Sequence, residues 1–73
     1  MNSLMIGSTG YAVESLQEML SQCGYDIDIT GKYDEKTKQA VSDFQKKEKV
    51  AATGIADGRT MTILAMRAAV EPS

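Results

Sequence analysis

The clearest hydrophobic pattern lies in residues 35–47. Small or apolar side chains recur there at intervals of three, one and three residues: Thr37, Ala40, Val41 and Phe44. This spacing places them on one face of a helix, with the polar residues on the other faces. Asp34 stands directly before the pattern, where a carboxylate can accept from the first N–H groups of a helix. The pattern therefore predicts a helix over residues 35–47.

A second stretch with helical periodicity covers residues 11–23. Its apolar stripe comprises Ala12, Val13, Leu16, Met19, Leu20 and Cys23. Gly24 follows, and glycine commonly ends a helix because it adopts a positive φ without steric cost. We therefore expect a helix over residues 11–23 that needs a partner for its apolar stripe.

A third helix is predicted over residues 58–70, with Pro72 marking its end. Thr60, Ile63 and Leu64 form its core stripe, and Arg67 falls on the same stripe. The other faces are also largely apolar: Met61, Ala65, Met66, Ala68 and Ala69. We interpret the alanines as good helix formers. A contact surface for another domain or a second copy is the alternative.

Between the first two helices, residues 25–33 alternate between apolar and polar side chains as a strand would. No second strand is evident in the sequence to pair with them. We therefore expect an extended loop that is pinned to the core by its apolar residues: Tyr25, Ile27, Ile29 and Tyr33.

The three predicted helices are preceded by related turns. Gly7, Gly31 and Gly54 each stand three residues before a glycine or aspartate at the helix start: Gly10, Asp34 and Asp57. One turn and helix cannot bury its own stripe, so three such units are expected to close on one another. The sequence predicts an all-α fold: a compact three-helix bundle in a single domain over residues 1–73. Its core covers about residues 4–70, and residues 71–73 are a tail or the start of a linker.

The composition of the chain excludes several classes of site and binding partner. The chain has 73 residues, a net charge of −2, one cysteine and no histidine. An internal disulfide and the common kinds of zinc site are therefore excluded. There is no broad basic surface for a nucleic-acid backbone. No apolar run is long enough for an export signal or a membrane span. We expect a monomer without cofactor, nucleic-acid or membrane partners, and any route out of the cell stays unknown.

Candidate catalytic and metal-binding groups are weak. Asp26, Asp28 and Asp34 alternate along one loop, but the calcium-loop pattern lacks its glycine and its distal glutamate. Ser8 and Thr9 have no histidine to activate them. We therefore predict that the chain is not an enzyme and holds no metal.

The spaced motifs resemble a known family. They are Leu4-x-x-Gly7-Ser8-x-Gly10-x-x-Val13-x-x-Leu16-Gln17-x-x-Leu20, then Gly24-Tyr25, then Thr30-Gly31-x-Tyr33-x-x-x-Thr37-x-x-Ala40-Val41-x-x-Phe44-Gln45, then Thr53-Gly54-Ile55-x-x-x-x-Thr60-x-x-x-Leu64. This pattern is similar to that of the peptidoglycan-binding domains of cell-wall hydrolases. The resemblance implies a non-catalytic bacterial or phage module that anchors a murein hydrolase, in cis or in trans, to the glycan or stem peptides of the cell wall. Lys49-Val50 stands where Gly-Leu is common in the family.

The resemblance directs attention to the loops for ligand binding. Aromatic rings suit sugar faces, and basic groups suit stem-peptide carboxylates. The candidate ligand-binding residues are Tyr25, Asp28, Thr30, Lys32, Tyr33 and Arg59. Burial is the competing interpretation for Tyr25 and Tyr33, and Tyr11 is expected to be the most exposed aromatic. Gln17 and Gln45 are expected to hold neighbouring loops.

A second interpretation is a protein-interaction or pro-domain module that docks on a partner enzyme. The fold also resembles the propeptide region of matrix metalloproteinases. In that region the metal-blocking cysteine lies in a proline-rich motif, whereas Cys23 lies in a predicted helix.

Overall fold

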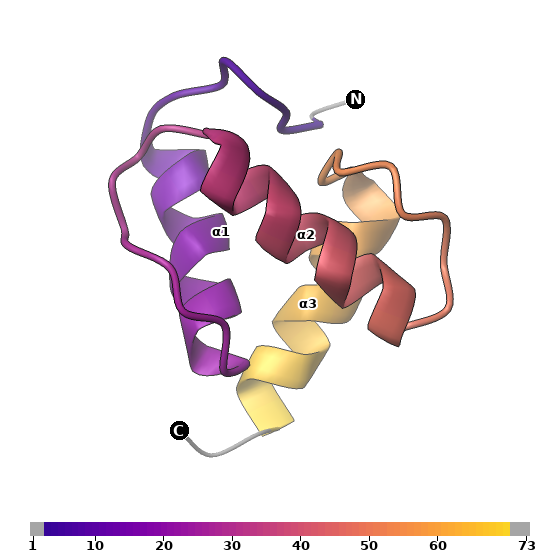
Figure 1. Cartoon of the computed structure of the whole chain (residues 1–73). Helices are drawn as coiled ribbons and strands as arrows, with labels where there is room; N and C mark the ends of the chain where they lie inside the picture. The colour runs from indigo at the N-terminus through magenta and orange to yellow at the C-terminus, as the bar shows by residue number, and fades with distance from the viewer. Residues whose placement is uncertain (1–2, 71–73) are drawn as a thin grey trace.

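The computed structural model describes residues 3–70, which form three helices and no β-strand. α1 spans Tyr11–Gln22, α2 spans Glu35–Lys47 and α3 spans Gly58–Val70 (Figure 1). The predicted all-α three-helix fold is confirmed, and α2 and α3 have the predicted bounds. The predicted tail, residues 71–73, lies outside the described residues.

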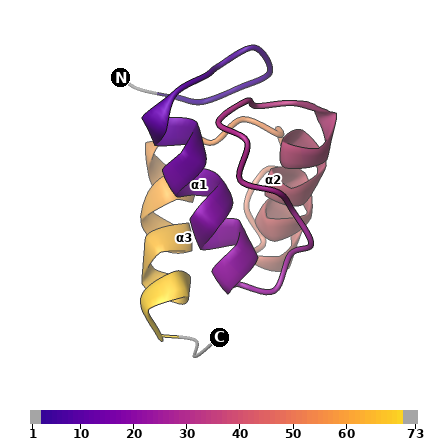
Figure 2. The same ribbon diagram turned by 90° about the vertical axis from the view of Figure 1, so that its left-hand side faces the viewer.

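Two of the helices lie side by side, and the third crosses them. α1 lies beside α3 and contacts it more extensively than it contacts α2 (Figure 2). α2 crosses in front of both in Figure 1. The apolar stripes meet in one cluster of buried residues: Val13, Leu16, Leu20, Ile27, Tyr33, Ala40, Val41, Phe44, Ala56 and Leu64. Each helix therefore buries a single face, as the period of its apolar residues requires.

The first helix differs in detail from the prediction. It ends one residue earlier, because Cys23 takes the capping position with φ −83° and ψ 2°. Gly24 follows with a φ of 100°, in the region that favours glycine. Ala12 was placed on the apolar stripe, but it is exposed. Gln17 is buried at the other edge of the stripe, so the buried face is rotated away from Ala12.

Aspartates begin the second and third helices. The Asp34 carboxylate accepts from the Thr37 backbone N–H at 3.1 Å, and the Asp57 carboxylate accepts from the Thr60 N–H at 2.9 Å. Each bond satisfies an N–H that has no partner within its helix. The predicted capping role of Asp34 is confirmed, and Asp57 repeats it.

The loop before α2 is extended, as predicted, but only part of its apolar set is buried. Ile27 is 9% exposed, whereas Ile29 is 48% exposed and does not pin the loop. The loop also finds a pairing partner that the sequence did not reveal. Thr9 and Lys32 form an isolated antiparallel bridge. Residues 7–10 thus pair with the end of this loop.

A second isolated bridge joins Leu4 to Ala56. The Leu4 N–H donates to the Ala56 carbonyl at 3.0 Å, and the Ala56 N–H donates back at 2.8 Å. The segment before α1 therefore touches the turns that precede both α2 and α3.

The outer face of α3 stays in solvent. Only Thr60 and Leu64 are buried in this helix, while Met66 is 62% and Val70 is 77% exposed. Both interpretations of this apolar surface, helix-forming residues or a contact face, are compatible with that exposure. No helix within residues 3–70 has the length and apolar character to cross a membrane.

Candidate functional site

A buried glutamine organises the turn before α2. The Gln17 side-chain oxygen accepts from the Thr30 N–H at 2.8 Å and the Gly31 N–H at 2.9 Å. Its amide nitrogen donates to the Lys32 carbonyl and to the Thr37 hydroxyl, both at 3.0 Å. One side chain thus fixes the turn of residues 30–33 and links it to the first turn of α2.

The turn before α3 repeats this arrangement. The Gln45 side-chain oxygen accepts from the Gly54 N–H at 3.0 Å. Its amide nitrogen donates to the Ile55 carbonyl at 2.9 Å and to the Thr60 hydroxyl at 3.0 Å. The internal repeat in the sequence is therefore a repeated hydrogen-bond network. The prediction that both glutamines hold loops is confirmed.

Tyr33 joins the two turns from inside the molecule. Its side chain is 2% exposed, and its hydroxyl donates to the Gly54 carbonyl at 2.6 Å. Burial raises the pKa of the phenol to about 12. In this position Tyr33 packs in the core, which agrees with the competing interpretation of this residue. Tyr11, by contrast, is 82% exposed, as expected.

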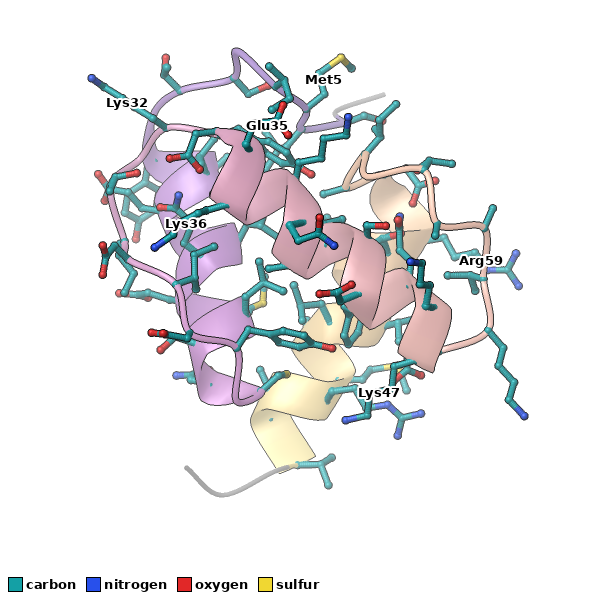
Figure 3. The ribbon with its side chains drawn as sticks, in the orientation of Figure 1. Met5, Lys32, Glu35, Lys36, Lys47 and Arg59 are labelled. Atoms are coloured by element: carbon teal, nitrogen blue, oxygen red, sulfur yellow. The ribbon has the colours of Figure 1, made fainter. Side chains whose placement is uncertain are left out.

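The other predicted ligand-binding residues divide between two sides of the molecule. Asp28, Thr30 and Lys32 are exposed together on the loop between α1 and α2. The Thr30 hydroxyl is already used within its own turn, where the Lys32 N–H donates to it at 3.2 Å. Arg59 is exposed at the start of α3, on the opposite side from Lys32 (Figure 3). The structure brings the loop residues together but not Arg59.

Tyr25 is half-buried beside the core. Its ring meets the Phe44 ring edge to face, with centroids 6.4 Å apart. Burial raises the pKa of its phenol, and the neighbouring charge of Asp43 adds to the effect. The ring borders a shallow pocket of about 210 Å³, whose other lining residues are Asp26, Lys36, Gln39, Ala40 and Asp43. Of the two candidate aromatics, Tyr25 is the one that reaches the surface.

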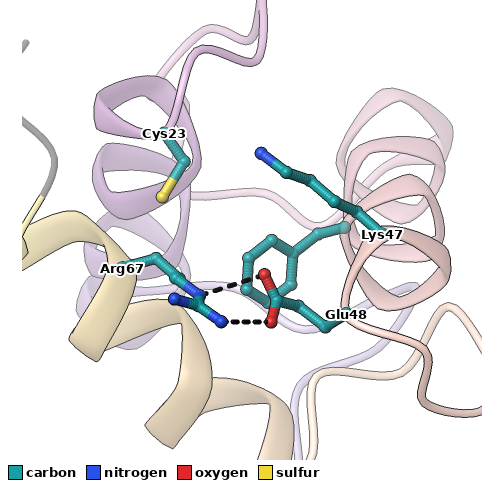
Figure 4. Close-up of a pocket in the computed structure, with 5 residues that line it drawn as sticks. Cys23, Lys47, Glu48 and Arg67 are labelled. Carbon is teal, nitrogen blue, oxygen red and sulfur yellow. Dashed lines mark hydrogen bonds and ion pairs between the residues drawn. The ribbon is translucent and has the colours of Figure 1, made fainter.

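A second hollow lies at the C-terminal end of α2. Its lining residues are Cys23, Phe44, Lys47, Glu48 and Arg67, and its volume is about 260 Å³ (Figure 4). We refer to it as the polar hollow. The Arg67 guanidinium donates from Nε and Nη2 to the two Glu48 oxygens, at 3.1 and 2.9 Å. The Glu48 side chain is 11% exposed and that of Arg67 is 55% exposed.

Sequence reasoning did not propose the polar hollow as a site. One signal was present, because Arg67 falls on the apolar stripe of the third helix. A cation at a stripe position needs a partner on a neighbouring element. That partner, Glu48, follows directly after α2.

The described part of the chain has no cluster of side chains suited to holding a metal ion. Within residues 3–70, no three cysteine or carboxylate side chains lie close enough together to hold an ion. The carboxylates with lowered pKa values are Asp34 and Asp57, and the main cause in each is a backbone N–H bond at a helix start. These perturbed groups therefore have structural roles.

Comparison with known proteins identifies the family. Residues 9–64 match the model of the peptidoglycan binding domain family, which is most of the chain. The chain belongs to this family. The match covers all of α1 and α2 and the first half of α3, so the repeated turns lie within the peptidoglycan binding domain itself.

Relatives place this domain in larger proteins. The chain is 43% identical over 58 residues to the carboxy-terminal processing protease CtpA of Bacillus subtilis (strain 168), which covers 80% of the chain and 12% of the protease. A fused zinc-dependent amidase, peptidase and peptidoglycan-binding protein from Clostridium acetobutylicum ATCC 824 superposes with a TM-score of 0.85 at 38% identity. That match covers 86% of this chain and 28% of the other.

A structure solved as a single domain is similar over its whole length. The SleB N-terminal domain superposes with a TM-score of 0.88 at 26% identity, covering 92% of this chain and 93% of that one. The three-helix arrangement of this peptidoglycan binding domain is therefore shared by a domain of nearly the same extent.

Proposed function

We propose that the chain is a non-catalytic module that holds a cell-wall hydrolase, attached or partnering, on peptidoglycan. The observation that carries the proposal is the family match over residues 9–64. Binding to an insoluble polymer raises the effective concentration of any catalytic domain linked to the module. The fused amidase from C. acetobutylicum supports a hydrolase as the catalytic partner. The site of action is then the cell wall.

The absence of catalysis is supported by the roles of the polar residues. The buried polar side chains Gln17, Thr37, Gln45 and Thr60 are all engaged in the turns and helix starts. An active site would instead place acid–base groups with perturbed pKa values in a cleft, whereas the carboxylates with lowered pKa values, Asp34 and Asp57, cap helices. The exposed loop residues Asp28, Thr30 and Lys32 form our candidate face for the polymer, and Tyr25 reaches the surface at the start of the same loop.

The direct experiment is co-sedimentation of the chain with purified sacculi. We expect enrichment in the pellet over an unrelated acidic domain of similar size. If the loop face makes the contact, Lys32→Gln reduces the bound fraction, whereas Arg59→Gln removes the same charge on the opposite side and leaves it unchanged. Equal recovery of the chain and of the unrelated domain would refute the proposal.

A module that docks on a partner enzyme is the second candidate. The match to the CtpA protease favours it, because the matched region is a small part of an enzyme. Binding to an isolated protease domain without any binding to sacculi would select this alternative.

A further inference from the structure

The polar hollow lies where α2 ends, beside the last turn of α1 and the second half of α3. Figure 3 places Lys47 at one end of α2 and Lys32 beyond the other, so this hollow is distinct from the loop face. Its volume of about 260 Å³ equals that of roughly eight or nine water molecules. The space suits a group as small as one or two amino-acid residues.

The charges around the hollow favour an anion. Lys47 and Arg67 are cationic and Glu48 is anionic, so the lining is net positive in a chain whose net charge is −2. Figure 4 shows the Lys47 side chain extending from α2 toward Cys23, with the Arg67–Glu48 pair below both. A ligand carboxylate placed there would meet two cations at once.

Glu48 fixes the geometry of the arginine. Two parallel N–H bonds to the carboxylate hold the guanidinium plane in one orientation. Arg67 is thus preorganised while its side chain remains 55% exposed.

Stability alone does not account for this arrangement. An apolar pair in place of a partly buried ion pair is often as stable or more stable, and Arg67 stands where an apolar side chain would extend the core of α3. Departures from a local sequence pattern tend to occur at functional positions.

We infer that the polar hollow binds the terminal carboxylate of a short peptide with small side chains, the kind of group that the stem peptides of peptidoglycan present. This inference rests on the proposed function and names the part of the polymer that is recognised. The carboxylate accepts hydrogen bonds from the Lys47 ammonium and the Arg67 guanidinium, and the volume of the hollow limits the rest of the peptide to small side chains. A neutral sugar would gain less from two cations.

The test is a chemical-shift titration with N-acetyl-D-alanyl-D-alanine, compared with the same dipeptide as its C-terminal amide. We expect shifts in the backbone amides of the hollow residues, and about tenfold weaker binding of the amide, which has lost the charge-assisted bonds. Lys47→Gln should weaken binding of the free acid by a similar factor.

Lys46→Gln is the matched control, because it removes the same charge from the neighbouring residue, which does not line the hollow. It should leave affinity within about twofold. Equal binding of acid and amide, or a loss with Lys46→Gln or Lys32→Gln equal to that with Lys47→Gln, would overturn the inference. If the chain sediments with sacculi but the dipeptide shifts no hollow resonance, the subsite fails and the proposed function stands.

Discussion

At the scale of single residues, the two buried glutamines have the most specific role. Each lies in a stripe position that would ordinarily take an apolar side chain, and each satisfies two or more loop groups. Leaving a buried donor or acceptor without a partner costs more than the bond itself contributes. These residues therefore determine the conformation of the turns as well as their stability.

Replacing Gln17 by methionine keeps the side-chain volume and removes its hydrogen bonds. We expect Gln17→Met to lower the free energy of unfolding by about 2–3 kcal/mol, because the Gly31 N–H and the Thr37 hydroxyl lose their partner. Gln22→Met, at an exposed position of the same helix, should change it by less than about 0.5 kcal/mol. Urea denaturation measures both, and equal effects would contradict the assigned role.

Lys49 has a backbone conformation that favours glycine, the residue that the resemblance to the family led us to expect at this position. Its φ is 62°, in the left-handed region where a Cβ is unfavourable. Lys49→Gly should therefore raise the free energy of unfolding by about 0.5–1 kcal/mol. Lys46→Gly, within α2, should lower it by about 1 kcal/mol. Thermal denaturation would show opposite shifts, and a decrease for both variants would disprove the explanation.

At the scale of elements, the helices could be predicted because period and capping are local properties. The stripe of residues 35–47 and the Asp34 cap together defined α2. The bridges of Thr9 with Lys32 and of Leu4 with Ala56 could not be predicted, since each is only one residue pair long and has no alternating pattern. Ala12 was misplaced because a buried polar residue, Gln17, rotated the buried face.

The aspartate caps make helix stability depend on pH. Hydrogen bonds from backbone N–H groups lower the pKa values of Asp34 and Asp57 in the folded state. A lowered pKa contributes stability that is present above the unfolded value of about 3.9 and is lost as pH falls through the folded value. We therefore expect these two caps to contribute to a fall in the melting temperature below about pH 4.

The double variant Asp34→Asn, Asp57→Asn isolates this effect. Asparagine caps a helix about as well as aspartate but does not titrate in this range. The variant should match the wild type near pH 7 to within a few degrees and lose less stability on acidification. An unchanged slope between pH 4 and pH 2 would show that other carboxylates cause the acid loss.

At the scale of the whole molecule, the sequence allowed the turns before the helices to be proposed as ligand candidates, and they stay a prediction, whereas it did not indicate the polar hollow. Its residues lie at positions 23, 44, 47, 48 and 67, and only the packing of three helices brings them together. Tyr33 illustrates the reverse case, because a residue next to the exposed turn points inward. Placement in a loop does not reveal which way a side chain faces.

The exposed apolar face of α3 bears on oligomeric state. We expect a monomer of 7.9 kDa by light scattering. The exposed apolar side chains Met66 and Val70 are separated along α3 by the charged Arg67, so they do not form a continuous apolar surface. If twice that mass is found, Met66→Glu should restore the monomer when α3 forms the interface. A dimer that resists this substitution would place the interface elsewhere.

The hydrogen bond from the Tyr33 hydroxyl to the Gly54 carbonyl affects how this end of the molecule opens locally. Together with the pairings of residues 4–10, it closes a ring of contacts through both turns. No single turn can swing out without breaking bonds in the others, so this end should behave as one cooperative unit in hydrogen exchange.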